Sequence, residues 1–482
     1  MSKYFAGDTK FTAQVKSLLS KVYGCSPLKD SVLERAIDYY QSAASTDHKL
    51  NKLNKDIDYL TTVVSTKVDA KQSKLERQRQ EFVKQLRFES HERYQHLQQI
   101  CRDIIELCEG ENYAETLRKS AQFLGTIQLL SPTEGNKIAA TNERHKPLYK
   151  AVLALRLLDE VCLQQLLPDT YITSELAKVS SNDVRALRGE NPAAYQGFVD
   201  AVKIPVLMAA LLQDIGNYHP DAQRIMHGAD GKLDKFRTLS TTERKALLQI
   251  NYRETLTYLL NGIGAGIYLG NCKTERSHFL AAENKKLTFI KRLLKSSINP
   301  KLGLGNLLKV PQIYSSIVLS TKASYNYKLL PKVYQALYQN AQRGTCSVAV
   351  VEALYQITGD FPQGYGVIYV PYEVDQELRY EYAIVNQLYP EKPNEPKCRM
   401  ATRHLTFIGF GHDLIIHESH NLYFVATAQA FSTITKERLN EILALLASNY
   451  LERKELDLLP RCWHPGEYFA SKVHQKLWIR DR

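Results

Sequence analysis

A long stripe of apolar residues between Leu50 and Leu107 constrains the fold of this chain more than any other feature of its sequence. Apolar side chains recur there at spacings of three, four and seven, and Lys, Asp, Arg, Gln and Glu fill the other positions. That spacing is typical of a coiled-coil helix, because it places the apolar residues on one side. The stripe weakens between Lys71 and Arg79, then resumes and ends near Gly110.

Two interpretations of this stripe stay open: a long helix packed within its own chain in a bundle, or a coiled coil that dimerises. Nothing in it resembles a catalytic arrangement, so residues 1–130 are predicted to form a helical and coiled-coil module for interaction or regulation. Residues 8–46 are predicted as two helices broken at Gly24–Pro27, with Ser26 as the N-cap of the second. Residues 113–130 are predicted as a further helix.

The composition is that of an ordinary globular protein, with 44% hydrophobic and 24% charged residues. A length of 482 residues allows about three domains. The eight cysteines contain no CxxC pair, which argues against a disulfide framework and a zinc ribbon. No segment has the apolar length of a signal peptide core or a membrane span, so we expect a cytoplasmic protein with no membrane span. No cofactor is predicted.

The chemically richest segment is Leu207–Pro220, LMAALLQDIGNYHP, in which an apolar helix-like run ends in polar side chains. The apolar run predicts a buried helix, so Gln213 and Asp214 would be held at its end by packing. A His-Asp pair at such a point suits one or two divalent ions. Here the first position is Gln213, whose neutral amide is a poor ligand for a transition metal.

The segment Gln213–Asn217, QDIGN, resembles the His-Asp-Ile-Gly-Lys signature of the HD phosphohydrolases, with two of the five positions changed. Further segments follow in the order of the HD-GYP branch, the cyclic di-GMP phosphodiesterases, and cover about the middle half of the chain. They are Leu239–Arg244 (with a capping-box pattern), Thr274–Arg276, Tyr325–Leu337, and Val348–Val370 with Pro390–Arg399, the last pair resembling a short β tail. The resemblance implies an all-α HD-like domain over residues 141–360.

Most metal ligands that this family requires are missing from the chain. No His stands at Ile250–Asn251, Lys273 and Thr274 stand where a His-His pair is required, and the GYP loop is absent. One remaining carboxylate, Asp214, cannot hold a metal pair or activate water. The positions of the degenerate site are therefore Gln213, Asp214, Gly216, Asn217, Asn251, Lys273, Thr274, Glu275 and Arg276.

The resemblance thus predicts a catalytically inactive relative with no catalytic residues and no metal, although enzymatic activity is not settled. The competing interpretation is a residual metal-dependent phosphodiesterase. It needs a replacement site from Asp214, His219, His227 and His278, with Asp214 and His219 as the first ligands.

Basic residues are concentrated between Lys273 and Lys309, where only Glu275 and Glu283 oppose them. Leu287, Ile290, Leu293 and Leu294 would form the apolar face of a basic amphipathic helix. The candidate anion-binding residues are Lys285, Lys286, Lys291, Arg292 and Lys295, and the alternative is a solvated helix face. The anion that the resemblance suggests is the cyclic dinucleotide.

The chain changes character after Gly359, where alternating apolar and polar runs predict a small antiparallel β unit within residues 361–482. A final helix is predicted at Thr435–Leu456, and a hairpin turn at His417–Asn421. The glycines of Asn261–Gly266 are interpreted as a helix C-cap and loop. The aromatic residues of the closing segment, from Arg461 onwards, are expected to dock it on the domain.

The fold class is therefore mainly α: a helical and coiled-coil module, an all-α HD-like domain, and an antiparallel β unit with a terminal helix. The leading hypothesis for function is a non-catalytic signalling protein that acts as a cyclic di-GMP receptor or a protein-binding adaptor. The alternatives are the residual phosphodiesterase and a structural scaffold built on the coiled coil. The expected partners are another protein or a second copy through the coiled coil, and a cyclic dinucleotide, whereas nucleic acid is not expected.

Overall fold

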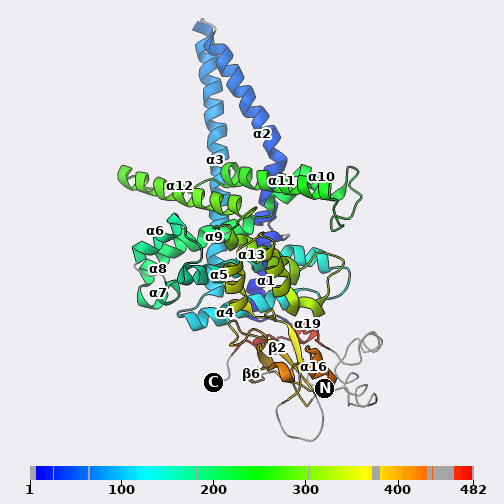
Figure 1. The fold of residues 1–482 in the computed structure, drawn as a ribbon. Helices are drawn as coiled ribbons and strands as arrows, with labels where there is room; N and C mark the ends of the chain where they lie inside the picture. The colour runs from blue at the N-terminus through cyan, green and yellow to red at the C-terminus, as the bar shows by residue number, and fades with distance from the viewer. Residues whose placement is uncertain are drawn as a thin grey trace. The chain divides into compact units, whose positions relative to one another are not determined.

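The computed structural model describes residues 7–24, 26–62, 66–179, 183–301, 303–371, 380–404, 406–409, 411–430, 437 and 461–479. It confirms a mainly α fold with a small antiparallel sheet in the C-terminal part of the chain (Figure 1). The chain divides into two compact units, each built from separate segments. Unit 1 comprises residues 1–19, 103–199 and 296–482, and unit 2 comprises residues 20–102 and 200–295.

In unit 2, the apolar stripe forms two antiparallel helices, α2 (Val32–Thr61) and α3 (Thr66–Cys108), which pair as a hairpin (Figure 1). Arg79 of α3 donates a 2.7 Å hydrogen bond to the Asn54 side chain of α2, and the Lys49 ammonium lies 4.1 Å from the centre of the Phe82 ring. The helix break therefore lies just after Thr61, and not in the polar stretch of Lys71–Arg79. Within one chain, the two halves of the stripe pack on each other.

The start of α2 differs from the prediction. Ser31, and not Ser26, is the N-cap, and it forms a capping box with Glu34. Ser26 lies in the turn that precedes α2, where its hydroxyl bonds to Asp30 at 2.7 Å. The preceding helix is α1 (Lys10–Tyr23). Glu34 stands three positions after Ser31 and supplies the reciprocal bond of a capping box, whereas Lys29 stands three positions after Ser26 and cannot.

The remaining elements of unit 2 surround the base of the hairpin. The apolar run forms α9 (Ile204–Leu212), which is buried on all sides, as predicted. The predicted Ser240–Glu243 capping box is confirmed at the start of α11. Gly264, with φ of 70°, ends η3 as a C-cap, which confirms the interpretation of the glycine segment. The elements that follow α9 are η2 (Ile215–Tyr218), α10 (Pro220–His227), α11 (Thr241–Thr257), η3 (Tyr258–Ile263) and α12 (Lys273–Ser296).

The core of unit 1 is α5 (Ile138–Gln164), which packs against α4, α7, α13 and α15. Its stretch from Pro147 to Cys162 is buried on every face, so it is a core helix. Helices also form within residues 168–195. The other helices of unit 1 are α4 (Tyr113–Leu130, as predicted), α6 (Thr170–Val179), α7 (Val184–Glu190), α8 (Pro192–Phe198), α13 (Asn306–Val318), η4 (Tyr327–Lys332), α14 (Val333–Gln342) and α15 (Val348–Thr358). The π-helix η1 (Val199–Lys203) links the segments of the two units.

The antiparallel sheet of unit 1 has the strand order β1-β2-β3-β6. Its strands are β1 (Gly366–Tyr369), β2 (Glu381–Val385), β3 (Lys397–Met400) and β6 (Asp413–Ile415), and β4 (Thr402–Arg403) pairs with β5 (Thr406–Phe407). The segment Val348–Thr358, which resembled a β tail, is helical. The hairpin predicted at His417–Asn421 is wrong, because β6 is followed by η5 (Glu418–His420) and α16 (Val425–Ala430).

The closing segment docks on this sheet, as predicted, through α19 (Gly466–Ala470) and η6 (His474–Lys476). The Trp463 ring stacks on Tyr382 at 4.7 Å, and its indole N–H donates to the Ala383 carbonyl at 3.1 Å. Thr9 N–H donates to the Gln475 side chain at 2.8 Å, so the first and last described segments of unit 1 meet. The predicted helix Thr435–Leu456 lies outside the described residues. Among the described helices, none combines the length and apolar character that crossing a bilayer requires.

Candidate functional site

The polar residues after α9 form a tight turn against α11. Gly216 begins this contact: a Cβ added there would lie 2.2 Å from the Asn251 carbonyl oxygen, so only glycine fits. The Gly216 N–H donates to the Thr255 hydroxyl at 3.1 Å, and the Asn251 amide donates to the Gln213 carbonyl at 3.3 Å. The structure therefore brings Gln213, Gly216 and Asn251 together.

Two further hydrogen bonds of this turn join neutral groups. The Thr255 hydroxyl donates to the Asn251 side-chain oxygen at 3.4 Å, and the Tyr23 hydroxyl donates to the Asp214 carbonyl at 3.3 Å. The Gln213 side chain is buried, and Asp214 and Asn217 are half-buried. At the position where the family would present a metal-binding imidazole, Asn251 instead fastens α11 to the end of α9.

His219 and its neighbours have structural contacts. The His219 Nδ1 accepts the Asp221 N–H at 3.2 Å and so caps α10, and the His219 Nε2 lies 3.9 Å from a Glu254 carboxylate oxygen. His227 ends α10, and His278 lies on the exposed first half of α12. Within the described ranges, no group of three or more His, Cys, Asp or Glu side chains is placed to hold a metal ion.

The four other positions of the predicted site, Lys273–Arg276, lie exposed on the first turn of α12. Their described contacts are local: the Tyr268 hydroxyl donates to Glu275 at 2.6 Å, and the Thr274 hydroxyl lies 3.3 Å from the Cys272 sulfur.

The amphipathic character predicted for α12 is confirmed, because Ile290, Leu293 and Leu294 are buried. Of the candidate anion-binding residues, Lys285, Lys291 and Lys295 are exposed, and Lys286 and Arg292 are half-buried. Lys286 is already paired with Glu283 at 2.8 Å. Binding of an anion by this face stays a prediction.

Glu283 fixes α12 to the base of the hairpin. Its carboxylate accepts from the Tyr94 hydroxyl at 2.5 Å and from the Gly266 N–H at 3.0 Å. Burial by itself would raise the pKa of Glu283, but hydrogen bonds from Lys286 and Tyr94 outweigh it and lower the pKa. The buried carboxylate is therefore charged, and it binds Lys286, Tyr94 and the Gly266 N–H.

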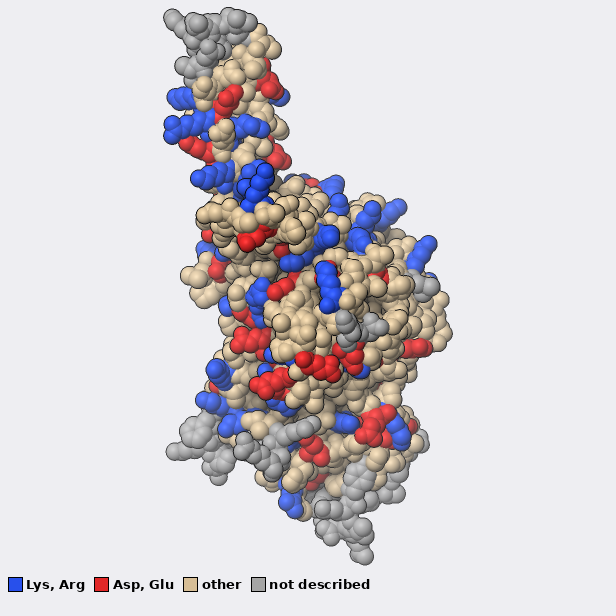
Figure 2. All heavy atoms as spheres, turned by 90° about the vertical axis from the view of Figure 1, so that its left-hand side faces the viewer, with Lys and Arg blue, Asp and Glu red and all other residues tan. Residues whose placement is uncertain are grey.

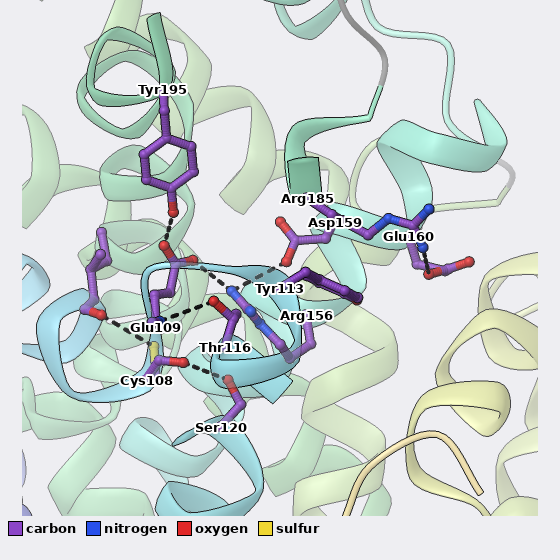
Figure 3. Close-up of polar contacts among 12 residues, drawn as sticks. Cys108, Glu109, Tyr113, Thr116, Ser120, Arg156, Asp159, Glu160, Arg185 and Tyr195 are labelled. Carbon is purple, nitrogen blue, oxygen red and sulfur yellow. Dashed lines mark hydrogen bonds and ion pairs between the residues drawn. The ribbon is translucent and has the colours of Figure 1, made fainter. Parts of the chain in front are cut away.

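The most highly charged buried cluster lies in unit 1, around Arg156 of α5 (Figure 3). Its guanidinium Nη2 lies 2.6 Å from Glu109 and 3.2 Å from Asp159, and the Tyr195 hydroxyl of α8 donates to Glu109. Burial opposes the charge of Arg156, but Asp159 and Glu109 raise its pKa above the ordinary value. The cluster joins the end of α3 to α5 and α8.

A second group lies beside it, around Glu160. The Tyr389 hydroxyl donates to the Glu160 carboxylate at 3.0 Å and lies 3.1 Å from the Tyr113 hydroxyl. Arg185 of α7 lies 3.8 Å from Glu160 and rests over the Tyr113 ring, 5.2 Å from its centre (Figure 3). Burial first, and then Tyr113 and Glu160, raise the pKa of Tyr389, so its hydroxyl keeps its proton.

The Arg156 side chain has no exposure to solvent, so we interpret these groups as structural contacts between helices. The sequence prediction missed the network. A signal was present, since Arg156 and Asp159 stand one helical turn apart inside the apolar run LALRLLDEV. Charged residues in such a run indicate a buried pair.

No protein-family model, no curated protein and no solved structure matches this chain. The likeness to the HD-GYP family therefore stays a prediction that depends on the quoted residues.

Proposed function

We propose that this protein is a non-catalytic signalling adaptor that binds another protein through unit 2. The observation that carries the proposal is where apolar side chains stay exposed. Unit 2 is the smaller unit, yet it holds nine of the thirteen large apolar side chains that are exposed among the described residues. They are Leu28, Tyr59, Phe88, Leu233, Leu248, Leu260, Ile267, Leu269 and Leu280.

The hairpin is the partner-facing arm in this proposal. Tyr59 on α2 is 69% exposed and Phe88 on α3 is 61% exposed. Lys and Arg side chains alternate with Asp and Glu along the column in the upper part of Figure 2. Aromatic anchors surrounded by charged residues are typical of protein interfaces, because the aromatic side chains supply buried area and the charges supply specificity.

A test compares two double variants that remove the same kind of side chain from different units. Tyr59→Ser with Phe88→Ser alters the hairpin, and Leu329→Ser with Val425→Ser alters exposed sites of unit 1. We expect quantitative affinity capture to lose a defined set of proteins with the hairpin variant and to keep that set with the control. Identical sets from the two variants would exclude the hairpin as the binding arm. Light scattering on the purified protein shows whether the partner is a second copy.

A cyclic di-GMP receptor is the second candidate, and the exposed Lys285, Lys291 and Lys295 of α12 favour it. Lysines compensate phosphate charge without hydrolysing the ester. If this function is correct, changing all three to Gln weakens binding of cyclic di-GMP in calorimetry by about tenfold or more. Changing Lys52, Lys55 and Lys74 of the hairpin to Gln is the control with the same change in charge.

The non-catalytic character is tested separately by elemental analysis of the purified protein. If two transition-metal ions per chain are found, the adaptor proposal is wrong and the residual phosphodiesterase is favoured, because a metal pair can activate water. A protein that holds neither metal nor nucleotide and captures no partner would be a structural scaffold.

A further inference from the structure

The first half of α12 is left uncovered in unit 2. Residues 273–282 are exposed, apart from the half-buried Phe279. The second half of the helix is held in place by burial of Ile290, Leu293 and Leu294. A helix anchored at one half in this way presents a convex surface to solvent at the other. Peptides are usually bound in grooves or at sheet edges, so a convex surface suits a flat partner better than a peptide.

Large aliphatic side chains are exposed at this end of α12. Leu269, in the segment that leads into the helix, is 80% exposed, and Leu280, on the helix itself, is 39% exposed. The leading segment is fastened to α12 by Tyr268, whose hydroxyl donates to Glu275 at 2.6 Å and whose ring centre lies 5.8 Å from that of Phe279. Leu269 and Leu280 are therefore held at the same end of the helix.

Basic residues share the side of α12 that carries Leu280. Lys273 and Arg276 stand seven and four positions before Leu280, and Lys291 stands eleven positions after it. These spacings place the four residues on one side of a helix. All four are exposed. The uncovered side of α12 is therefore both apolar and basic.

The positive charge of the chain is concentrated in the unit that carries this helix. Unit 2 contains 30 Lys and Arg against 20 Asp and Glu, so it holds +10 of the formal net charge of +12. Of the two acidic residues of α12, Glu275 accepts the Tyr268 hydroxyl and Glu283 is buried. Exposed aliphatic side chains beside Lys and Arg are typical of surfaces that bind anionic lipid, because the apolar groups enter the headgroup boundary while the cations stay in water.

We propose that unit 2 binds the surface of a membrane that contains anionic phospholipids, through Leu269, Leu280 and the basic residues Lys273, Arg276 and Lys291. The two leucines enter the boundary between headgroups and acyl chains, and the three cations lie against the lipid phosphates. Single-stranded nucleic acid fits this surface less well, because it is bound largely by stacking on aromatic rings. The site is independent of protein binding by the hairpin, so either function can fail without the other.

The first test measures binding of the full chain to vesicles by cosedimentation. Vesicles of phosphatidylcholine alone are compared with vesicles of an equal mixture of phosphatidylcholine and phosphatidylglycerol. We expect the mixed vesicles to bind the protein at least about tenfold more tightly, and added salt to weaken this binding by screening the charges. If the mixed vesicles do not bind while single-stranded RNA or polyglutamate does, the surface takes a soluble polyanion and the proposal is wrong.

A double variant tests the aliphatic side chains. We expect Leu269→Ser with Leu280→Ser to weaken binding to the mixed vesicles by about tenfold or more. Leu329→Ser with Val425→Ser, at exposed sites of unit 1, is the control and should keep the affinity of the wild type. The substituted side chains are exposed, so all these proteins should keep their Tm. Equal affinities of the two double variants would overturn the proposal.

A triple variant tests the basic residues. Changing Lys273, Arg276 and Lys291 to Gln should weaken binding to the mixed vesicles by about tenfold or more. The control changes Lys52, Lys55 and Lys74 of the hairpin to Gln, which removes the same charge from exposed sites elsewhere in unit 2. Equal losses from the two triple variants would show that net charge alone attracts the vesicles, and the assignment to α12 would be wrong.

Leu269→Trp reports whether this segment enters the bilayer. The two natural tryptophans, Trp463 and Trp478, are each 3% exposed, so a change in emission on adding vesicles would come from the new indole. We expect its emission to shift to the blue with the mixed vesicles and to stay unchanged with phosphatidylcholine alone. Binding to the mixed vesicles without a shift would mean that position 269 stays in water, and the proposal would be overturned.

Discussion

At the scale of single residues, Arg156 and its two carboxylate partners depend on one another. The guanidinium is wholly buried in an apolar helix core, and its Nη2 lies 2.6 Å from Glu109 and 3.2 Å from Asp159. Removing one member of a buried ion cluster is costly, because the remaining charges lose compensation that water cannot restore. Loss of Arg156 removes the cation that lies beside both Glu109 and Asp159.

We therefore expect Arg156→Met to lower the free energy of unfolding by about 3–5 kcal/mol. Arg118→Met is the control: its guanidinium lies 3.6 Å from Glu115 near the surface, where a pair contributes about 1 kcal/mol or less. Denaturant unfolding of both variants measures the difference. Equal losses would show that Glu109 and Asp159 are stable without their arginine.

The raised pKa of Asp360 predicts that the stability of the fold depends on pH. Burial first, and then the nearby Glu418, raise its pKa from 3.8 to about 6, although a hydrogen bond from Tyr355 opposes the shift. A carboxyl with a raised folded pKa contributes stability below its unfolded pKa and loses that stability as pH rises through about 6. Asp360→Asn removes this dependence, because the amide does not titrate.

The free energy of unfolding of Asp360→Asn, relative to the wild type, should therefore rise between pH 4 and pH 7.5, by about 1–3 kcal/mol. Urea unfolding at the two pH values measures this difference. A constant difference between the two proteins would mean that Asp360 titrates normally in the folded state.

Prediction from sequence at the residue scale succeeded where partners are near in the chain. Ser240 and Glu243 are three positions apart, and their capping box was recognised. Glu109 reaches Arg156 across 47 residues, and no local pattern encodes that contact. The same limit applies to Asn251, whose bond to Gln213 spans 38 residues and depends on how α11 packs.

At the scale of elements, the apolar pattern predicted where helices exist better than where they begin or how they pack. The Leu50–Leu107 stripe was recognised as helical, but its period is the same in one long helix and in a hairpin. The sequence between Thr61 and Thr66 carries no Gly or Pro signal. No helix was predicted for α6, α7 and α8, because they are short and bury few residues each.

The start of α2 gives a prediction at this scale. The Ser31 hydroxyl is buried, donates to the Gly24 carbonyl at 2.8 Å and caps the Glu34 N–H. We expect Ser31→Ala to lower the free energy of unfolding by about 1–2 kcal/mol and to speed amide exchange in the first turn of α2. Ser45→Ala, at an exposed site of the same helix, should have no such effect. Unchanged exchange in that turn would contradict the assigned cap.

At the scale of the whole molecule, the two units interleave along the chain. Unit 2 takes its segments from residues 20–102 and 200–295, and unit 1 takes the three segments around them. Sequence periodicity cannot reveal this arrangement, because it reports which faces are apolar and not which segments cover them. The contiguous division into 1–130, 141–360 and 361–482 stays a separate prediction. The two divisions differ in whether the isolated fragment 141–360 should fold.

The fragment 141–360 would lack three partners that its residues use in the full chain. Arg156 would lose Glu109, and the turn after α9 would lose the Tyr23 hydroxyl that binds the Asp214 carbonyl. Tyr40, which donates to the Glu254 carbonyl at 3.1 Å, would be missing too. We therefore expect this fragment to unfold without a cooperative transition in calorimetry, whereas the full chain unfolds cooperatively. A sharp transition of the isolated fragment, with slow amide exchange in α5 and α11, would support the contiguous division instead, because burial within 141–360 would then suffice.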